Sequence, residues 1–384
     1  MDICDQSSVS FHTRAQHRPE VRAAERIKIG TGREAHAAAN ITMNKFLVTG
    51  ANGFIGSHVV DQLLARGNHV RCLVRRSSQR PWMEGRDVEL VEGDIAVPPS
   101  LTRAVAGCDA VIHLAGLTCA LNKNDFLATN AQGVRHVAAA CAAQETPPVL
   151  VVVSSLAAAG PATHGRANVE SDPPRPVSNY GQSKLAGEQE AAAMAGKLPI
   201  SIVRPPIVVG PRDRLSFALF RPIARWGVHV VPGFTERRFS VVHATDLASA
   251  LLSVAERGAR LPALSNKNGA PPQTGQGFYY VAASEQPTYE ELGHMIAAAL
   301  GRPRARRVRL PETVVWATGG MTELTGRLLR RPLSLSLDKV REAVAGNWTC
   351  DAARIRDELG FTPAAPLADR LRATAEWYRE AGWL

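Results

Sequence analysis

Short apolar segments alternate with amphipathic ones along the first half of the chain. The apolar segments are rich in Val, Ile and Leu, and stretches with helical periodicity separate most of them. They occupy residues 46–48, 69–74, 88–94, 110–116, 149–155 and 201–210. Continuous apolar strands between amphipathic helices are typical of a parallel sheet with helices on both faces. We therefore expect an α/β fold whose chemistry lies at the carboxyl ends of the strands.

Three glycines follow the first apolar segment at a spacing of three. Gly50, Gly53 and Gly56 come after the strand at 46–48 and open a helix whose apolar positions recur at helical period. Glycine permits a tight turn and a close backbone approach to a ligand, and the free N–H groups at a helix start attract phosphate. The order of strand, glycine loop and helix predicts a dinucleotide cradle in a Rossmann-type, doubly wound parallel sheet.

The alternation loosens after Gly210, and a more helical pattern continues to the end of the chain. An exposed loop is expected at 262–277, and a strand begins at Phe278. Thr288 and Glu291 have the spacing of a capping box, which predicts that a helix begins there. This second part of the chain is consistent with a smaller lobe over the edge of the sheet.

The pattern divides the chain into three parts. Residues 1–42 have no hydrophobic periodicity, and we expect a disordered or mis-assigned N-terminal extension there. Residues 43–210 are predicted to form a Rossmann domain that binds NAD(P). Residues 211–384 are predicted to form a smaller, mainly helical substrate-binding lobe, interwoven with the last Rossmann elements.

Composition narrows the classes of function. No apolar stretch approaches the length of about eighteen residues that a spanning helix needs, and the six cysteines include no C-x-x-C pair. These features predict a cytoplasmic protein with reduced thiols, no zinc site and no membrane span. The net charge of +10 peaks in the basic run at 302–309, where no aromatic residue is interleaved to stack on bases. We interpret that run as a solvated link and expect a small-molecule substrate rather than nucleic acid.

Two clusters of polar residues are candidates for catalysis. Tyr180 and Lys184 lie four apart in a stretch with helical character, which places both side chains on one face. A nearby ammonium favours the phenolate form of a tyrosine and would let Tyr180 exchange a proton with a substrate oxygen. Ser154 and Ser155 end the strand at 149–155, where a hydroxyl would hold that oxygen.

The motifs together resemble the extended short-chain dehydrogenase/reductase superfamily, also called the NAD-dependent epimerase/dehydratase family. The resemblance covers most of residues 44–384. It is carried by TGANGFIG at 49–56, VEGD at 91–94, HLAG at 113–116, TNAQG at 129–133, the SS pair at 154–155, YGQSK at 180–184, RPPIVVGP at 204–211 and VVHATDLA at 241–248.

The resemblance implies roles for individual residues. It implies that Tyr180 transfers the proton, that Lys184 orients the ribose of the cofactor and that Ser155 polarises the substrate. Ser155 is preferred to Ser154 because the catalytic hydroxyl of the family stands five residues before the glycine that corresponds to Gly160. Asn130 is implied to be a structural bridge, and relatives often form homodimers through helices that include the Tyr180 helix. The implied cofactor contacts are Gly50, Gly53, Phe54, Ile55 and Gly56 at the pyrophosphate, Asp94 and Ile95 at the adenine, Leu114, Ala115 and Gly116 along the cofactor, and Pro205 and Ile207 at the nicotinamide.

The end of the second predicted strand favours NADP(H) over NAD(H). An acidic residue at this place would hold the ribose hydroxyls of NAD. Here Val74 takes that position, and Arg75 and Arg76 follow it. Guanidinium groups pair well with a 2′-phosphate, so NADP(H) is the favoured cofactor and NAD(H) the alternative.

Three functions remain open from the sequence. The leading hypothesis is an NAD(P)-dependent oxidoreductase that interconverts a secondary alcohol and a ketone, similar to the hydroxysteroid dehydrogenase and dihydroflavonol reductase branches. The alternative is a nucleotide-sugar epimerase or dehydratase. Against it, Phe239 stands where many such relatives carry an arginine for the diphosphate, with Arg238 one step off, and Leu156 stands where dehydratases carry an acid. A non-catalytic nucleotide-binding protein is the third reading.

Overall fold

The computed structural model describes residues 43–163, 165–263, 275–333 and 335–384 of the 384-residue chain. The predicted extension at 1–42 and most of the predicted loop at 262–277 lie outside these residues. The division into domains at residue 210 stays a prediction.

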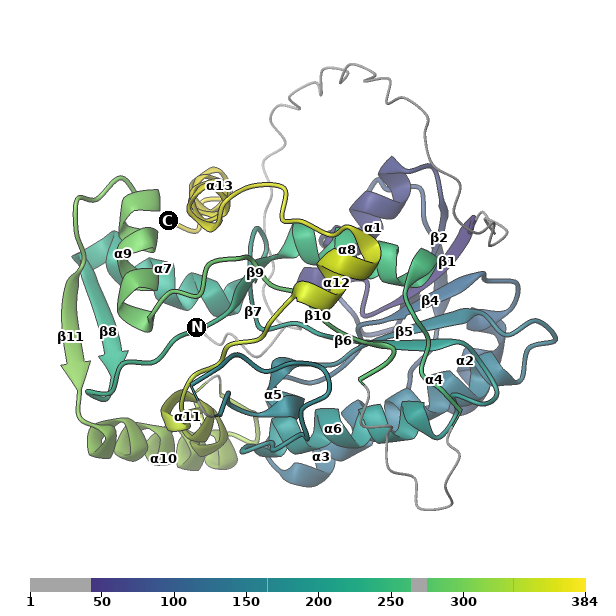
Figure 1. Ribbon diagram of the computed structural model, residues 1–384, viewed down its shortest axis with the longest axis horizontal. Helices are drawn as coiled ribbons and strands as arrows, with labels where there is room; N and C mark the ends of the chain where they lie inside the picture. Colours follow the sequence, from purple (N-terminus) through teal and green to yellow (C-terminus); the bar gives the residue numbers. More distant parts are fainter. Residues whose placement is uncertain (1–42, 164, 264–274, 334) are drawn as a thin grey trace.

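A seven-stranded parallel sheet forms the centre of the molecule, which confirms the predicted fold class (Figure 1). Its strand order is β10-β6-β5-β4-β1-β2-β3, and every neighbouring pair runs parallel. The order reverses between β1 and β4, where a doubly wound sheet opens a crevice for a ligand. The strands are β1 (Lys45–Thr49), β2 (His69–Val74), β3 (Glu89–Glu92), β4 (Ala110–His113), β5 (Val149–Val153), β6 (Ile200–Arg204) and β10 (Phe278–Tyr280).

Helices cover both faces of this sheet. One core contains buried apolar residues of α1 (Phe54–Ala65), α8 (Ala244–Arg257) and α12 (Ala353–Leu359). The opposite core contains those of α2 (Pro98–Val105), α4 (Gly133–Ala142) and α6 (Asn179–Ala192). Burial on both faces explains why the strands read as continuous apolar runs rather than alternating ones.

The segment at 201–210 forms two strands, so the prediction of a single strand there was wrong. β6 ends at Arg204, and after Pro205 and Pro206 the chain begins β7 (Ile207–Val209), which pairs with β9 (Val241–His243) outside the main sheet. Proline has no N–H to donate to a sheet ladder, so two in succession end β6 and release the chain toward the second lobe.

The second lobe packs around its own apolar core. Buried residues of α7 (Arg214–Trp226), α9 (Tyr289–Ala299) and α13 (Leu367–Glu380) form it. The predicted capping box is present at the start of α9, where the Thr288 and Glu291 side chains each accept a backbone N–H. Beyond this core, α10 (Glu312–Leu328) and α11 (Leu337–Val344) pack together next to α3 (Lys123–Leu127) and α5 (Leu156–Ala159) (Figure 1).

The basic run at 302–309 is not a solvated link, which corrects the prediction. Arg306–Leu310 forms strand β11, which pairs in parallel with β8 (Val228–Pro232). Its arginines face outward, and Arg307 and Arg309 both form ion pairs with Glu290 of α9.

Among the residues that the structure describes, no helix has the length and apolarity that crossing a bilayer needs.

A buried ion pair fixes α6 against the sheet. The Arg204 guanidinium donates from Nε to Oε1 of Glu188 at 2.8 Å and from Nη2 to Oε2 at 2.6 Å, and both side chains are almost fully buried. Ser154 donates to the same carboxylate at 2.5 Å, and the guanidinium lies 4.7 Å from the centroid of the Phe278 ring. Burial alone would lower the pKa of Arg204, but Glu188 raises it above its ordinary value, so the pair stays charged.

We expect Glu188→Gln to lower the free energy of unfolding by about 3–5 kcal/mol, because it leaves a buried guanidinium without its counter-charge. Chemical denaturation measures the loss. The control is Arg372→Gln, which breaks an exposed pair with Asp369 and is expected to cost less than about 1 kcal/mol. Equal losses in the two variants would contradict the role given to the buried pair.

Candidate active site

The glycine loop between β1 and α1 is closed by backbone contacts that exclude side chains. Gly50 has a φ of +70°, and a Cβ there would lie 2.8 Å from the backbone N of Ala115. A Cβ on Gly56 would lie 2.2 Å from the carbonyl oxygen of Gly50. These two glycines therefore let the loop turn and let α1 pack onto it.

Gly53 is less crowded than Gly50 and Gly56. A Cβ on Gly53 would lie 3.1 Å from the carbonyl oxygen of Gly50, which is a tight contact, and would meet no other atom within 4 Å. Gly53 is also the N-cap of α1, which begins without a side-chain cap and without an acidic residue in its first turn. The backbone N–H groups of Phe54 and Ile55 are therefore available to an anion, and the loop fits the pyrophosphate of a dinucleotide.

The segment 114–116 forms the wall opposite the glycine loop. The backbone N–H groups of Leu114 and Ala115 donate to the carbonyl and hydroxyl oxygens of Thr49, so the ends of β1 and β4 are fixed side by side. Gly116 is exposed, and a Cβ on it would lie 2.9 Å from Oδ1 of Asn130 and 3.9 Å from Nζ of Lys184. The wall therefore ends at the Lys184 ammonium.

The residues predicted for the adenosine end also lie at this edge of the sheet. Asp94 and Ile95 follow β3, and the Asp94 carboxylate accepts the N–H of Ala96 at 2.9 Å. Arg75 and Arg76 follow β2 and are exposed, with Arg76 3.5 Å from Glu92. The Asn52 amide donates to the carbonyl of Gln79 at 3.2 Å, which ties the loop after β2 to the glycine loop.

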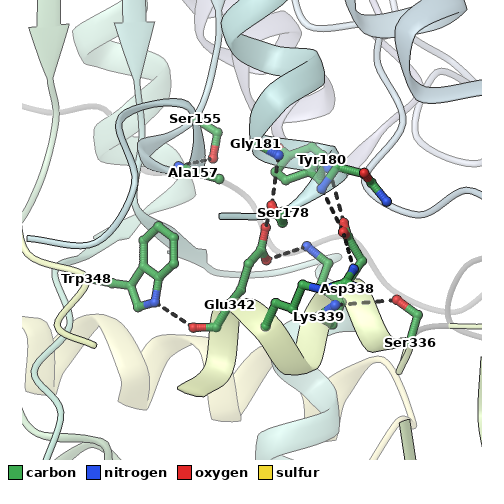
Figure 2. Close-up of polar contacts among 12 residues, drawn as sticks. Ser155, Ala157, Ser178, Tyr180, Gly181, Ser336, Asp338, Lys339, Glu342 and Trp348 are labelled. Carbon is green, nitrogen blue, oxygen red and sulfur yellow. Dashed lines mark hydrogen bonds and ion pairs between the residues drawn. The ribbon is translucent and has the colours of Figure 1, made fainter. Parts of the chain in front are cut away.

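The structure brings the Ser155 hydroxyl and the Tyr180 phenol together. Ser155 is the N-cap of α5 and accepts the N–H of Ala157 at 3.1 Å (Figure 2), while Tyr180 lies in the first turn of α6, near enough for the Ser155 hydroxyl to lower the pKa of its phenol. Ser154 instead faces the buried carboxylate of Glu188. Of the two serines, Ser155 is the one beside the phenol.

Lys184 lies one turn after Tyr180 on α6. Its Nζ donates to the carbonyl oxygen of Val153 at 2.7 Å. Burial lowers the pKa of Lys184 to about 8, against an opposing effect of Glu188. Pro205, whose carbonyl accepts the N–H of Leu156, and Ile207 continue this edge from the end of β6.

The cation that lies against the phenol ring is Lys339 of α11, whereas the sequence pointed to Lys184. The Lys339 ammonium is 4.5 Å from the centroid of the Tyr180 ring and forms an ion pair with Glu342 at 2.9 Å (Figure 2). Burial raises the pKa of Tyr180, while Lys339 and the hydrogen bond from Ser155 act to lower it and Glu342 acts to raise it. The net direction is upward, so in the protein without its cofactor the neutral phenol is favoured, and the phenolate beside an oxidised nicotinamide stays a prediction.

A cavity of about 280 Å³ lies beside the start of α6. It is bounded on one side by the segment 120–126 and on the other by α10 and α11 with the loop between them. The Phe126 ring lines it and lies 6.0 Å from the Tyr180 ring. Asn179, the first residue of α6, also lines it. Phe126 and Asn179 connect the cavity with Tyr180, although Ser155 and Tyr180 are not themselves among its lining residues.

The model of the NAD dependent epimerase/dehydratase family matches residues 46–265. The chain belongs to this family. It is accordingly an NAD(P)-dependent oxidoreductase of the extended short-chain dehydrogenase/reductase superfamily, as the motifs predicted.

Similar members of the epimerase/dehydratase family carry the names of reductases and dehydratases. A protein of Caulobacter vibrioides named ceramide reductase is 33% identical over 337 residues, which cover 88% of this chain and 95% of that protein. A putative dihydroflavonol 4-reductase of Synechocystis is 27% identical, over 88% of this chain and 96% of its own. A dTDP-glucose 4,6-dehydratase of Streptomyces venezuelae, solved with NAD, shares the fold with a TM-score of 0.68 and 23% identity, over 88% of this chain and 98% of its own.

Sequence reasoning missed the contribution of α11 to the candidate site. The Asp338 carboxylate accepts the backbone N–H groups of Asn179 and Tyr180 at 2.7 and 3.1 Å, and Ser178 donates to Glu342 at 2.6 Å. The pattern that would have marked these residues is the cluster DKVRE at 338–342 on a predicted helix, but nothing local ties it to Tyr180.

Proposed function

We propose that this protein reduces a ketone on an apolar substrate to a secondary alcohol, with NADPH as the favoured reductant. The observation that carries the proposal is the meeting of Ser155 and Tyr180 at the carboxyl edge of the sheet, one helical turn from Lys184. This edge also holds the glycine loop, whose free backbone groups fit a pyrophosphate.

When bound, the nicotinamide cofactor supplies the hydride to the carbonyl carbon. The chain supplies the proton and the orientation. Ser155 donates a hydrogen bond to the carbonyl oxygen, and Tyr180 transfers its phenolic proton to that oxygen as the alcohol forms. Because burial raises the pKa of Tyr180, the phenol is protonated at neutral pH, which suits an acid in reduction better than a base in oxidation.

The apolar character of the substrate is supported by the names of the relatives. The cavity itself has a mixed lining, in which Phe126, Leu333 and Leu335 stand beside five charged side chains. The relatives' names, which include a ceramide reductase, a sterol demethylase protein and a 2-alkyl-3-oxoalkanoate reductase, refer to substrates with extended hydrocarbon parts. We infer a lipid-like ketone as the substrate class and a cytoplasmic location. The homodimer that the resemblance implies stays a prediction.

The nucleotide-sugar epimerase or dehydratase alternative has less support. Phe239 is buried and packs against Tyr289. Arg238, one position before it, lies within 3.6 Å of Glu236 and 3.8 Å of Glu291 and so already has acidic neighbours. Leu156, after the catalytic serine, is buried in an apolar cluster. The position that would bind a sugar diphosphate therefore has no free arginine, and the position that would serve a dehydration has no acid.

The decisive test of function is net cofactor oxidation. We expect the protein to oxidise NADPH with long-chain ketones and to show no net oxidation with UDP- or GDP-sugars. Tyr180→Phe is expected to lower kcat by about 10²–10⁴-fold, because it removes the proton but keeps the ring. Conversion of a sugar nucleotide with no net consumption of cofactor would instead establish the alternative.

The two serines provide a matched pair of variants for the same assay. Ser155→Ala is expected to lower kcat with little change in the unfolding transition. Ser154→Ala removes a hydrogen bond to buried Glu188 and is expected to lower stability by about 1–3 kcal/mol, with kcat largely retained in the folded protein. The reverse pattern would make Ser154 the group that acts on the substrate.

Cofactor preference is tested at the loop after β2. We expect a higher kcat/KM with NADPH than with NADH, because Arg75 and Arg76 are exposed at the predicted position of a 2′-phosphate. Replacing both by Gln is expected to reduce the preference about tenfold, with the main change in KM for NADPH. A wild-type preference for NADH, unchanged in the double variant, would refute the assignment.

A further inference from the structure

Helix α10 packs its small residues inward. Gly319 and Gly326 are buried, and a Cβ on Gly319 would lie 2.6 Å from Cγ2 of Val340 on α11. Val315 is the one large side chain of α10 that is buried with them. The close approach of α10 to α11 therefore depends on glycines, and few of the large side chains of α10 are used in the core.

The large apolar residues of α10 face outward instead. Val314, Ala317, Met321, Leu324 and Leu328 recur at the spacing of one helix face and are all exposed, and together they form a surface that we call the α10 stripe. The exposed fractions of Met321, Leu324 and Leu328 are 70%, 61% and 76%. α10 lies at the outer edge of the lobe, with α11 on its inner side (Figure 1).

Basic residues accompany the apolar stripe. The run from Leu324 to Leu337 contains six leucines, three arginines and no acidic residue. Arg327 and Arg330 are exposed within it, and Arg327 forms an ion pair with Glu323, which lies directly before the run. An exposed apolar helix face beside arginines is typical of a helix that lies in the interface of an anionic bilayer, where the apolar side chains insert and the arginines are attracted to the lipid headgroups.

We propose that the α10 stripe and the arginines after it dock the protein on the surface of an anionic lipid bilayer. A second copy is a poorer occupant, since pairing centred on the exposed leucines would bring three arginines of each chain together beside one acid, Glu323, from each. Gly326, Arg327 and Leu335 also line the cavity beside Phe126, so the docked face borders that cavity. That a docked protein takes up a lipid-like ketone from the bilayer rests on the proposed function, whereas the docking itself does not.

Vesicle flotation tests the docking without any turnover. We expect the full chain to float with phosphatidylcholine vesicles that contain 30% phosphatidylglycerol, about tenfold more than with phosphatidylcholine alone. Leu324→Asp with Leu328→Asp is expected to abolish flotation. Trp226→Asp, at a residue that is 66% exposed on α7, is the matched control and is expected to float like the wild type.

Other outcomes of this experiment overturn the docking proposal. Failure of the wild type to float does so, and so does equal loss in the Trp226 control. A dimer in solution that the two leucine substitutions dissociate, without vesicle binding, assigns the stripe to a second copy. Because flotation is read without substrate, a protein that floats but oxidises no NADPH fails only the proposed function.

A second inference comes from the opposite side of α11. The groups around the Tyr180 ring are Lys339 and Glu342 of α11, Ser155 of α5, Phe126 of α3 and Cys119 of the loop after β4 (Figure 2). Lys339 is the cation nearest the ring among the residues that act on it in the described structure. Asp338, next to it in sequence, accepts the N–H of Tyr180 itself.

We propose that Lys339 is a positioning residue that holds the Tyr180 ring and adjusts the acidity of its phenol, with Glu342 opposing it. The Lys339 ammonium favours the phenolate, whereas the Glu342 carboxylate favours the neutral phenol. The two groups therefore act on the pKa of the Tyr180 phenol in opposite directions. This role rests on the proposed function of Tyr180, but the acidity of the phenol can be measured without a substrate.

Ultraviolet titration of phenolate measures this acidity, with Tyr180→Phe as the reference for the other four tyrosines. Burial raises the pKa values of Tyr279, Tyr280, Tyr289 and Tyr378 as well, so the difference between the wild type and Tyr180→Phe isolates the ionisation of Tyr180. We expect Lys339→Met to move the ionisation of Tyr180 upward by about one pH unit, and Lys339→Arg to restore it.

The same variants have a kinetic readout. The pH profile of kcat for alcohol oxidation is expected to shift upward in Lys339→Met and downward in Glu342→Gln, with KM changed less than kcat. A loss of kcat that is the same at every pH, with the ionisation of Tyr180 unmoved, would reduce Lys339 to a structural residue. A shifted titration in a protein without turnover would refute the proposed function and leave this inference intact.

Discussion

The geometry of the candidate site depends on the buried pair between Glu188 and Arg204. Arg204 belongs to β6, and Glu188 is on α6 one turn after Lys184, so the pair fixes the rotation of α6 against the sheet. Only one rotation lets Glu188 reach both Arg204 and Ser154. The same rotation turns Lys184 to the carbonyl of Val153 and Tyr180 to Ser155. A wholly apolar contact would allow more freedom here, whereas a bidentate pair has directional bonds.

The start of α6 is fixed from the second lobe. The first N–H groups of a helix lack partners within it, and Asp338 accepts two of them while Ser178 accepts the N–H of Gly181. Because Tyr180 is one of the two residues that Asp338 holds, the backbone of the proposed acid is fixed by a residue of α11. The sheet therefore sets how α6 is rotated, and the second lobe sets where it begins.

Sequence patterns correctly predicted the elements that depend on residues close together in the chain. The strand, glycine loop and helix of the cradle and the capping box at Thr288 depend on neighbours in sequence, and all are present. The strand at Arg306–Leu310 was missed because its alternation is carried by arginines, which resemble a solvated run. Two prolines ended β6 inside one apolar segment.

The contact between Asp338 and Tyr180 could not be predicted from the spacing of residues in the sequence. Asp338 and Tyr180 are 158 positions apart, and their contact is set by how the second lobe packs on the first. The predicted partner Lys184 has the right spacing to Tyr180, but its ammonium is directed to the carbonyl of Val153. Spacing places residues on a common face, whereas burial and the choice of partners are properties of the assembled fold.

One consequence concerns selectivity. The cavity beside Tyr180 has α10 and α11 as one wall, and that wall carries both the carboxylate that holds the start of α6 and the ammonium under the phenol ring. A molecule too bulky for the cavity would push this wall outward and separate Lys339 from the ring. Misfit would then impair proton transfer as well as affinity, and discrimination between ketones would be expressed in turnover.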